Sequence, residues 1–351
     1  MEVKRSNPRA IAKQIMRDSI LEVLRVENEA FKAALLQEIK NYPFSRNRAI
    51  AALNSGAFDK VTLRDIHLDF CYSGIRGFTD AILMAFHTRQ LENRLGTKGK
   101  MASRFLLTLN ILDEFGFLPG CGEDDYYLGN PIMSHPLLFD AVLDELGADD
   151  AARNSFIASP AARNIRACFL NAFADFWSLL AILAVAEEEV MLFSPAMREA
   201  TKAVGVDVSR GYYMVHGSSD DAETNAFDDD HQNDVLYILV HTAQPQQYAH
   251  IHSAAMNFCA LWDAFWHKQM ERLPLGDRTP QVWQLASTHI KLKVSTGSDA
   301  NRSFLDWAKK EKLFFAIRFE PAPSIYFVNR SWARHLCNTR SRWRNKLGKI
   351  N

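Results

Sequence analysis

The stretch FWSLLAILAVAEEE, at Phe176–Glu189, joins the most apolar run of the chain to three consecutive acids. The apolar part, Phe176–Ala186, has eleven residues, whereas a helix that spans a membrane needs about 20. The run is therefore typical of a helix buried in a globular core. Neighbouring residues on a helix point about 100° apart, so at least one of Glu187, Glu188 and Glu189 should face the interior if this helix is central. The alternative is that the helix emerges into water at these acids.

Apolar residues keep a helical spacing on both sides of this run, up to about residue 272. The spacing predicts a long helix at Ala161–Val190, which contains the run and resumes after Pro195. The other predicted helices are Pro8–Tyr42, Thr62–Leu95, Ser103–Phe115, Pro136–Leu146, Tyr212–Ser219, Asp228–Thr242 and Gln247–Glu271. The chain has only 16 Gly and 12 Pro in 351 residues, which favours long uninterrupted elements. The predicted fold class is therefore mainly α, a helical bundle.

A different composition begins near Leu273, where Pro and Gly residues interrupt the helical pattern. Strand-like runs and one helix-like segment follow at His289–Ser295, Arg302–Lys310, Leu313–Phe319 and Ser324–Asn329. This change predicts a helical domain at 1–272 and a small α+β C-terminal appendage at 273–351. The appendage ends in a basic tail, Arg330–Asn351, with seven Lys and Arg and no acid. One short basic run gives little specificity, so a solvated or partner-bound tail is favoured over a phosphate site.

Overall charge and cysteine usage exclude several classes of protein. The 41 Lys and Arg balance 41 Asp and Glu, so no net charge draws the chain to nucleic acid or to an anionic membrane. Residues 1–9 are polar and lack the apolar segment of a secretion signal. The five cysteines are scattered, odd in number and without a CxxC pair, which argues against disulfides and structural zinc. We expect a cytoplasmic protein with no membrane or nucleic-acid partner.

Acids and histidines on apolar helices are the first candidates for chemistry, because an unpaired buried charge is costly. A helical bundle that binds two iron ions needs carboxylates and imidazoles that project inward from facing helices. Glu114 ends the apolar helix Ser103–Phe115, and His135 stands where the next predicted helix begins. The alternative is that both are ordinary polar residues at helix ends.

A second group of candidates lies in the polar stretch that follows Tyr212. His216 and Asp220 are four residues apart, and Asp228 and His231 are three apart. Either spacing places both side chains on one face of a helix, as a metal pair requires. The alternative is a solvated acidic loop with incidental histidines.

Taken in chain order, these residues resemble the heme-oxygenase-like diiron oxidases and oxygenases, the non-heme relatives of the heme oxygenase and thiaminase folds. The resemblance covers roughly residues 41–268 and rests on Asn110–Glu114, Ser134–Pro136, Glu187 and Tyr212–Gly217. It implies a heme-oxygenase-like helical bundle that holds two Fe ions, cycling between Fe2+ and Fe3+, with O2 as co-substrate. The ligands that the resemblance implies are Glu114, His135, Glu187, His216, Asp228 and His231, with Asp220, Glu188 and Glu92 as alternates.

The chain departs from the family pattern at two places. The segment Gly116–Ser134 separates the first Glu from the first His, which in the family lie a few residues apart. The distance along the chain from His216 to His231 is longer than the spacing between the corresponding histidines of the family. An insertion must therefore lie between these two residues. Either Asp220 or Asp228 then takes the place of the family's aspartate. The intact Asp-x-x-His spacing with His231 favours Asp228.

The resemblance also implies a function. It is that of a non-heme diiron, O2-dependent oxidase or oxygenase in natural product biosynthesis, acting on a small amino-acid-like or fatty-acid-like substrate. The outcome would be desaturation, C–C cleavage or N-oxygenation, with an external electron donor. The alternative is a non-catalytic, metal-free binding or scaffold protein on the same fold. Helical proteins of this kind often form two-fold homodimers, although no residue here indicates one.

Overall fold

The computed structural model describes residues 7–86, 91–117, 129–216, 228–273, 315–319 and 323–327, with the backbone alone at 228–229 and in the last two ranges. The chain divides into two compact units, Met1–Asp277 and Arg278–Asn351, which are described separately. The first unit is helical throughout its described elements, which confirms the mainly α prediction. Within the described ranges, no helix has the length and apolar character needed to cross a membrane.

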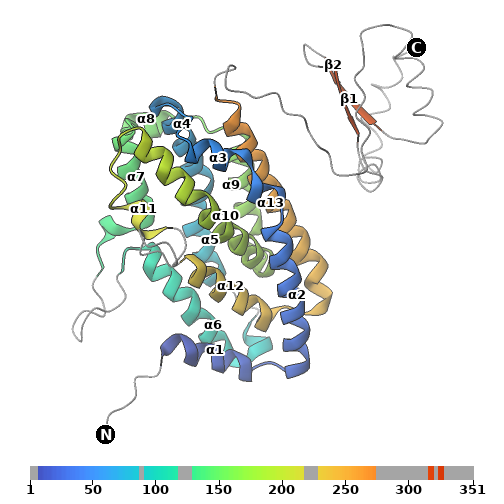
Figure 1. Cartoon of the computed structure of the whole chain (residues 1–351). Helices are drawn as coiled ribbons and strands as arrows, with labels where there is room; N and C mark the ends of the chain where they lie inside the picture. The colour runs from blue at the N-terminus through green and yellow to red at the C-terminus, as the bar shows by residue number, and fades with distance from the viewer. Residues whose placement is uncertain are drawn as a thin grey trace, which may run out of the picture. The chain divides into compact units, whose positions relative to one another are not determined.

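The helices of the first unit follow one another along the chain as labelled in Figure 1. Its first half contains α1 (Pro8–Asp18), α2 (Glu22–Lys40), η1 (Pro43–Arg46), α3 (Arg48–Asn54), α4 (Lys60–Phe70), η2 (Cys71–Ile75), α5 (Arg76–Phe86) and α6 (Glu92–Glu114). Its second half contains η3 (Pro131–Met133), α7 (His135–Glu145), α8 (Asp150–Ser155), α9 (Pro160–Ala172), α10 (Phe176–Ala203), α11 (Tyr212–Val215), α12 (Asp228–Thr242), η4 (Pro245–Gln247) and α13 (Tyr248–Met270).

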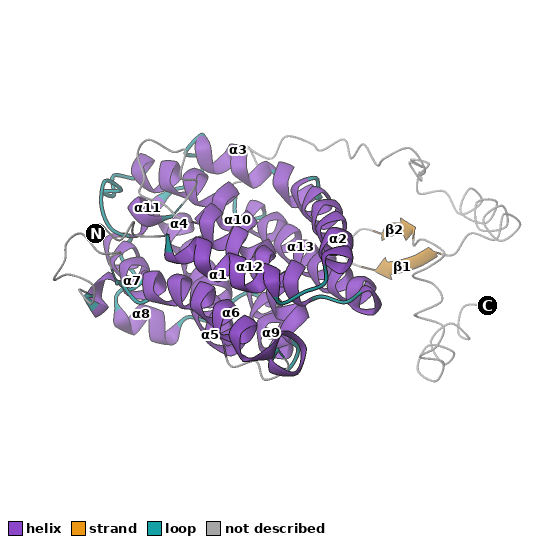
Figure 2. Ribbon diagram, turned by 90° about the horizontal axis from the view of Figure 1, so that it is seen from below, coloured by secondary structure: helices purple, strands orange, loops and turns teal. Residues whose placement is uncertain are grey.

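Helix α10 is the core helix of this bundle. It contacts α3, α5, α9, α12 and α13, and both ribbon views show it among the other helices (Figures 1 and 2). Every residue from Ser178 to Glu189 is buried, which is the pattern of a helix surrounded by protein on all sides. The three acids are buried with the apolar run. The alternative that the helix emerges into water at these acids is therefore wrong.

Two features of the predicted helix Ala161–Val190 differ in the structure. It is divided into α9 and α10, because the Asp175 carboxylate accepts a hydrogen bond from the Trp177 backbone N–H and caps a new helix there. Helix α10 then continues through Pro195 rather than resuming after it. Proline removes one backbone donor from a helix, and burial of the residues on both sides of Pro195 holds the helix together across that loss.

The predicted helix Pro8–Tyr42 is also divided, into α1 and α2. The break falls at Ser19, whose hydroxyl donates to the Ile15 carbonyl oxygen at 2.8 Å and so bonds the last turn of α1. Helix α1 contacts α6 and α12, whereas α2 contacts α12 and α13 (Figure 1). Because of the break, the apolar faces of α1 and α2 pack against different sets of helices.

The other predicted helices need smaller changes. The prediction Thr62–Leu95 corresponds to α4, η2 and α5 in direct succession, with η2 as a π-helical turn; residues 87–90 lie outside the description. Helix α6 begins at Glu92, earlier than predicted, and bends at Gly96, whose φ of 65° is one that glycine adopts readily. Helix α12 has the predicted bounds, Asp228–Thr242.

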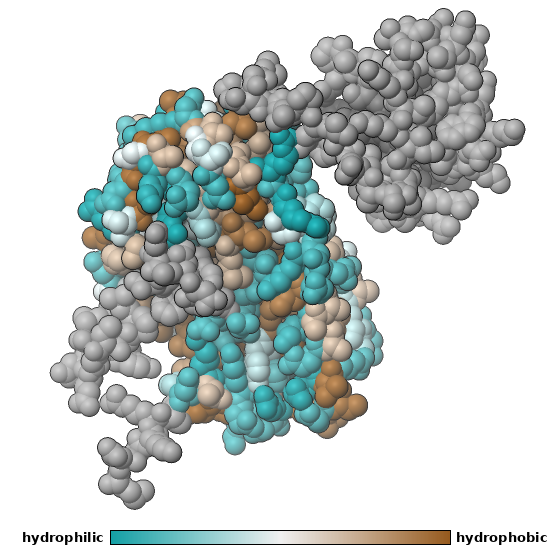
Figure 3. All heavy atoms as spheres, in the orientation of Figure 1, coloured by the Kyte–Doolittle hydropathy of each residue, from teal (hydrophilic) through white to brown (hydrophobic). Residues whose placement is uncertain are grey.

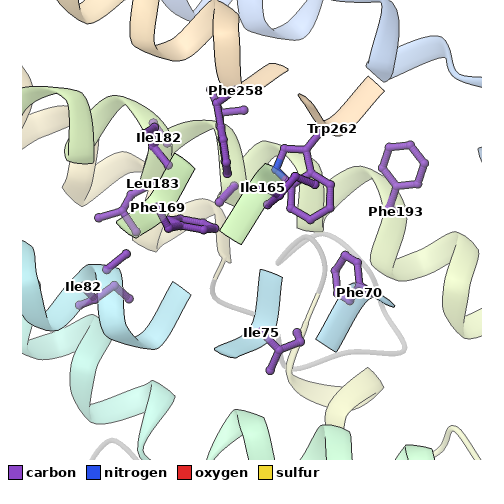
Figure 4. Packing of buried hydrophobic residues seen from close by; sticks show 14 of the residues in the cluster. Phe70, Ile75, Ile82, Ile165, Phe169, Ile182, Leu183, Phe193, Phe258 and Trp262 are labelled. Carbon is purple, nitrogen blue, oxygen red and sulfur yellow. The ribbon is translucent and has the colours of Figure 1, made fainter. Parts of the chain in front are cut away.

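Large aromatic side chains fill the centre of the bundle. Phe70, Phe169, Phe258 and Trp262 lie close together there on α4, α9 and α13 (Figure 4), and Phe193 of α10 stacks on Trp266. Edge-to-face and stacked ring pairs of this kind contribute about 0.5–1.5 kcal/mol each beyond their buried area. The face of the helical unit in Figure 3 is mostly hydrophilic, with apolar side chains scattered over it.

The second unit contains one described pair of strands, β1 (Phe315–Phe319) and β2 (Pro323–Phe327). They pair antiparallel, with Ile317 opposite Ile325. The predicted segments His289–Ser295 and Arg302–Lys310 and the basic tail lie outside the described residues. The α+β appendage as a whole therefore stays a prediction.

Candidate metal centre

The C-terminal end of α6 and the start of α7 bring two of the expected ligands together. Glu114 is the last residue of α6 and is buried, with 4% of its surface exposed. His135 is the first residue of α7 and is equally buried. Because a carboxylate only accepts hydrogen bonds, His135 Nδ1 donates to Glu114 Oε1, over 3.0 Å.

A glycine turn explains how these two residues meet in spite of the long segment between them. Gly116 adopts φ 80°, and a Cβ atom there would lie 2.6 Å from the Asn130 carbonyl oxygen. The Asn130 backbone N–H donates in return to the Gly116 carbonyl oxygen at 3.1 Å, and Phe117 forms a β-bridge with Gly129. The segment between them is thus closed at its base. This departure from the family spacing does not separate Glu114 from His135.

Two further histidines reach the same place from later in the chain. His216 follows α11, and its ring centroid lies 4.4 Å from that of His135 and 4.2 Å from that of Tyr212. His231 lies in the first turn of α12 and is buried. Its Nε2 atom lies 3.7 Å from Asp113 Oδ2.

Asp113 is the member of this cluster that sequence reasoning missed. Its Oδ2 atom also lies 3.6 Å from His135 Nε2, so the carboxylate stands between two imidazoles. The sequence marks it only by its position next to Glu114 at the end of an apolar helix, and helical spacing does not distinguish which of two adjacent acids points inward. In the structure both do.

A narrow cavity of about 30 Å³ adjoins the cluster. Its polar lining includes Glu114, His135, Glu187, Glu189 and His216. The remaining walls are largely apolar and come from α4, η2, α5, α9, α10 and α13, including Phe70, Gly74, Ile75, Phe78, Phe169 and Trp262. A Cβ atom at Gly74 would lie 3.3 Å from the Trp262 ring. Because Gly74 has no side chain, the backbone of η2 can approach that ring closely. π-Helical turns such as η2 are frequent at functional sites.

The three acids of α10 have three different environments. Glu187 lines the cavity, and its Oε1 accepts a hydrogen bond from Asn110 Nδ2 at 3.4 Å. Glu188 Oε2 accepts one from Gln232 Nε2 at 3.1 Å. Glu189 Oε1 accepts one from Trp266 Nε1 at 2.7 Å, and burial raises the pKa of Glu189 to about 8. Glu187 and Glu189 both line the cavity beside Glu114 and the histidines, whereas Glu188 does not. Of the two, Glu189 is held by Trp266 and favours its neutral form, so Glu187 is the better candidate for a charged ligand.

Burial and the imidazoles act in opposite directions on the two acids of α6. Burial favours the neutral form of Glu114, but the nearby imidazoles, His135 above all, outweigh it and hold the pKa of Glu114 below its usual value. Burial prevails at Asp113 and raises the pKa of that carboxyl, although His135 and His231 oppose the shift. The imidazoles thus favour the charged form of both carboxyls, and they outweigh burial only at Glu114.

The structure brings five of the expected ligands into one region: Glu114, His135, Glu187, His216 and His231. The side chain of Asp228 and all of Asp220 lie outside the described residues. The alternate Glu92 lies at the opposite end of α6, where it pairs with Lys100 at 2.6 Å, and is not part of the cluster.

Within the described ranges, no group of three or more His, Cys, Asp or Glu side chains is arranged to hold a metal ion. The closest contact that the acids make here with a histidine is the hydrogen bond from His135 to Glu114. A bound ion would therefore require these side chains to turn toward one point.

A comparison with protein-family models finds no match for the chain, and no curated protein sequence matches it.

Proposed function

We propose that the protein is a non-heme diiron oxidase or oxygenase that uses O2 to oxidise a small amino-acid-like or fatty-acid-like substrate. One observation carries the proposal. Glu114, His135, Glu187 and His216 line one buried cavity, and they come from elements that are far apart along the chain. His231 joins them through its contact with Asp113.

The chemistry of these donors suits iron. Carboxylates and imidazoles that project from facing helices are the ligand set of di-iron sites in helical bundles. When bound, the two iron ions would supply the electrons that reduce O2. Substrate and an external electron donor complete the proposed reaction.

The residues of the chain itself would prepare this centre in three ways. Glu114 fixes the ring of His135 through its Nδ1 atom, so that Nε2 faces Asp113 on the other side. Asn110 holds the Glu187 carboxylate at the cavity wall. The aromatic and aliphatic walls, Phe169 and Trp262 among them, exclude water from the reacting groups.

A metal-free binding or scaffold protein is the rival function. A scaffold does not need several acids at the wall of one cavity, because taking carboxylates out of water is costly. Here Glu187 and Glu114 are both buried at the wall of one cavity, beside two histidines. Acids and imidazoles gathered in this way are the donor set of a metal site, and this favours the metalloenzyme.

The proposal is tested by adding Fe(II) to the metal-free protein under argon and then admitting O2. We expect close to two iron ions per chain, a transient visible absorption and consumption of O2. Glu187→Gln should lose iron, whereas Glu188→Gln, its neighbour on the same helix, should retain it, because Glu188 bonds to Gln232. Iron bound at well below one ion per chain, with no consumption of O2, would favour the scaffold.

A further inference from the structure

The carboxylate of Asp113 lies near two imidazoles, at distances longer than those of hydrogen bonds. Its Oδ2 atom lies 3.6 Å from His135 Nε2 and 3.7 Å from His231 Nε2. Hydrogen bonds between nitrogen and oxygen span about 2.7–3.2 Å, so neither contact is one. The three side chains come from α6, α7 and α12, and of the three His135 lines the cavity.

The same separation suits two ligands of one metal ion. Bonds of about 2.0–2.2 Å from a metal to nitrogen and oxygen, opened to about 109–120°, place the two ligand atoms about 3.4–3.7 Å apart. The two Asp113 contacts fall within or at the limit of that range. The described residues hold no ready-made metal group, so binding of an ion would require these three side chains to turn toward one point.

Glu114 occupies a different position relative to the same histidine. It receives the hydrogen bond of His135 Nδ1 at 3.0 Å, which leaves no room for an ion between the two. A histidine that binds a metal through one nitrogen usually donates the N–H of the other to a carboxylate. Asp113 and Glu114 thus face the two different nitrogens of one imidazole.

We infer that Asp113, His135 and His231 bind one metal ion, and that Glu114 positions His135 rather than binding that ion. The inference rests on the proposed metal centre and changes its ligand set, since Asp113 takes the place that an aspartate of the last helix would hold. Two imidazoles and one carboxylate are a ligand set that leaves open positions on a non-heme ferrous ion. Glu187 and His216, on the cavity wall, remain for the second ion.

A matched pair of substitutions separates the two roles. Asp113→Asn and Glu114→Gln each exchange one carboxylate oxygen for an amide and keep the shape of the side chain. Binding of Co(II) is measured by calorimetry, and the visible absorption of bound Co(II) reports its coordination. We expect Asp113→Asn to weaken one of the two binding events by about 100-fold or more and to change the spectrum. Glu114→Gln should cost about tenfold, the lower end for a residue that orients a ligand, with the spectrum retained.

Three results are informative in different ways. A larger loss in Glu114→Gln than in Asp113→Asn, or equal losses, would overturn the inference while the metal centre stands. Failure of the wild-type chain to bind Co(II) or Fe(II) would overturn the proposed function as well. Asp113→Glu, which keeps the carboxylate, should restore part of the affinity, and thermal unfolding of every variant shows whether a loss reflects misfolding.

Discussion

Acid should destabilise this protein through one buried histidine that is not part of the candidate metal centre. His67 is fully buried in α4, where its Nδ1 donates to the Leu63 carbonyl oxygen at 2.8 Å and its Nε2 accepts from the Tyr213 hydroxyl at 2.5 Å. Burial lowers the pKa of His67 to about 4. In the unfolded chain that pKa is about 6.5.

The sign and size of the effect follow from this difference. Between pH 6.5 and 4 the unfolded chain takes up a proton at His67 that the folded chain does not. The stability is therefore complete above the unfolded value and is lost as the pH falls toward the folded value. Each unit of pKa difference corresponds to about 1.4 kcal/mol, so the loss of stability approaches about 3.4 kcal/mol at low pH and reaches about 2.5 kcal/mol at pH 4.5.

Urea unfolding followed by circular dichroism at a series of pH values measures this contribution. Because other groups also titrate, the informative quantity is the difference between the wild-type chain and His67→Gln. We expect that difference to shrink by about 2–3 kcal/mol between pH 8 and pH 4.5. His252→Gln, which removes an exposed histidine of α13, is the matched control. Parallel curves for wild type and His67→Gln would refute the argument, because they would mean that burial does not keep this imidazole neutral.

Three further predictions concern the candidate centre. His216→Ala and His231→Ala should each abolish loading of the full complement of iron while helical circular dichroism stays largely unchanged; full iron occupancy in both would contradict the ligand assignment. Gly116→Ala should destabilise the chain by at least about 1–2 kcal/mol, because φ is 80° there and the new Cβ would meet the Asn130 carbonyl oxygen; urea unfolding measures the loss, and unchanged stability would exclude the glycine turn as a requirement. Removal of residues 278–351, the second compact unit, should leave iron binding measurable, and loss of all iron would place part of the centre in that unit.

Helical periodicity predicted most of the helices, because apolar spacing reports which face of a helix is buried. It did not predict where helices divide. The breaks at Ser19 and before Asp175 contain neither Pro nor Gly, and they arise from side-chain hydrogen bonds and from packing against different neighbours. Pro195 shows the opposite case. Proline normally ends a helix, but α10 continues through it because the residues on both sides are buried.

The candidate centre likewise contains residues that the sequence predicted and one that it did not. The family resemblance pointed to Glu114, His135, Glu187, His216 and His231, and the structure places these five residues in one region. The sequence did not identify Asp113, because its position matters only in relation to two imidazoles of α7 and α12. Contacts between distant segments set its role, and no local pattern in the sequence encodes them.

The bridge between Phe117 and Gly129 has a consequence for how this chain can vary. The bridge fixes the separation of Phe117 and Gly129, so the number of residues inserted between them does not set the distance between Glu114 and His135. Closing a connection costs only about 0.6 kcal/mol more for each doubling of its length. We therefore expect insertions between 118 and 128 to be tolerated, which makes this position suitable for grafting new recognition sequences beside an unaltered centre.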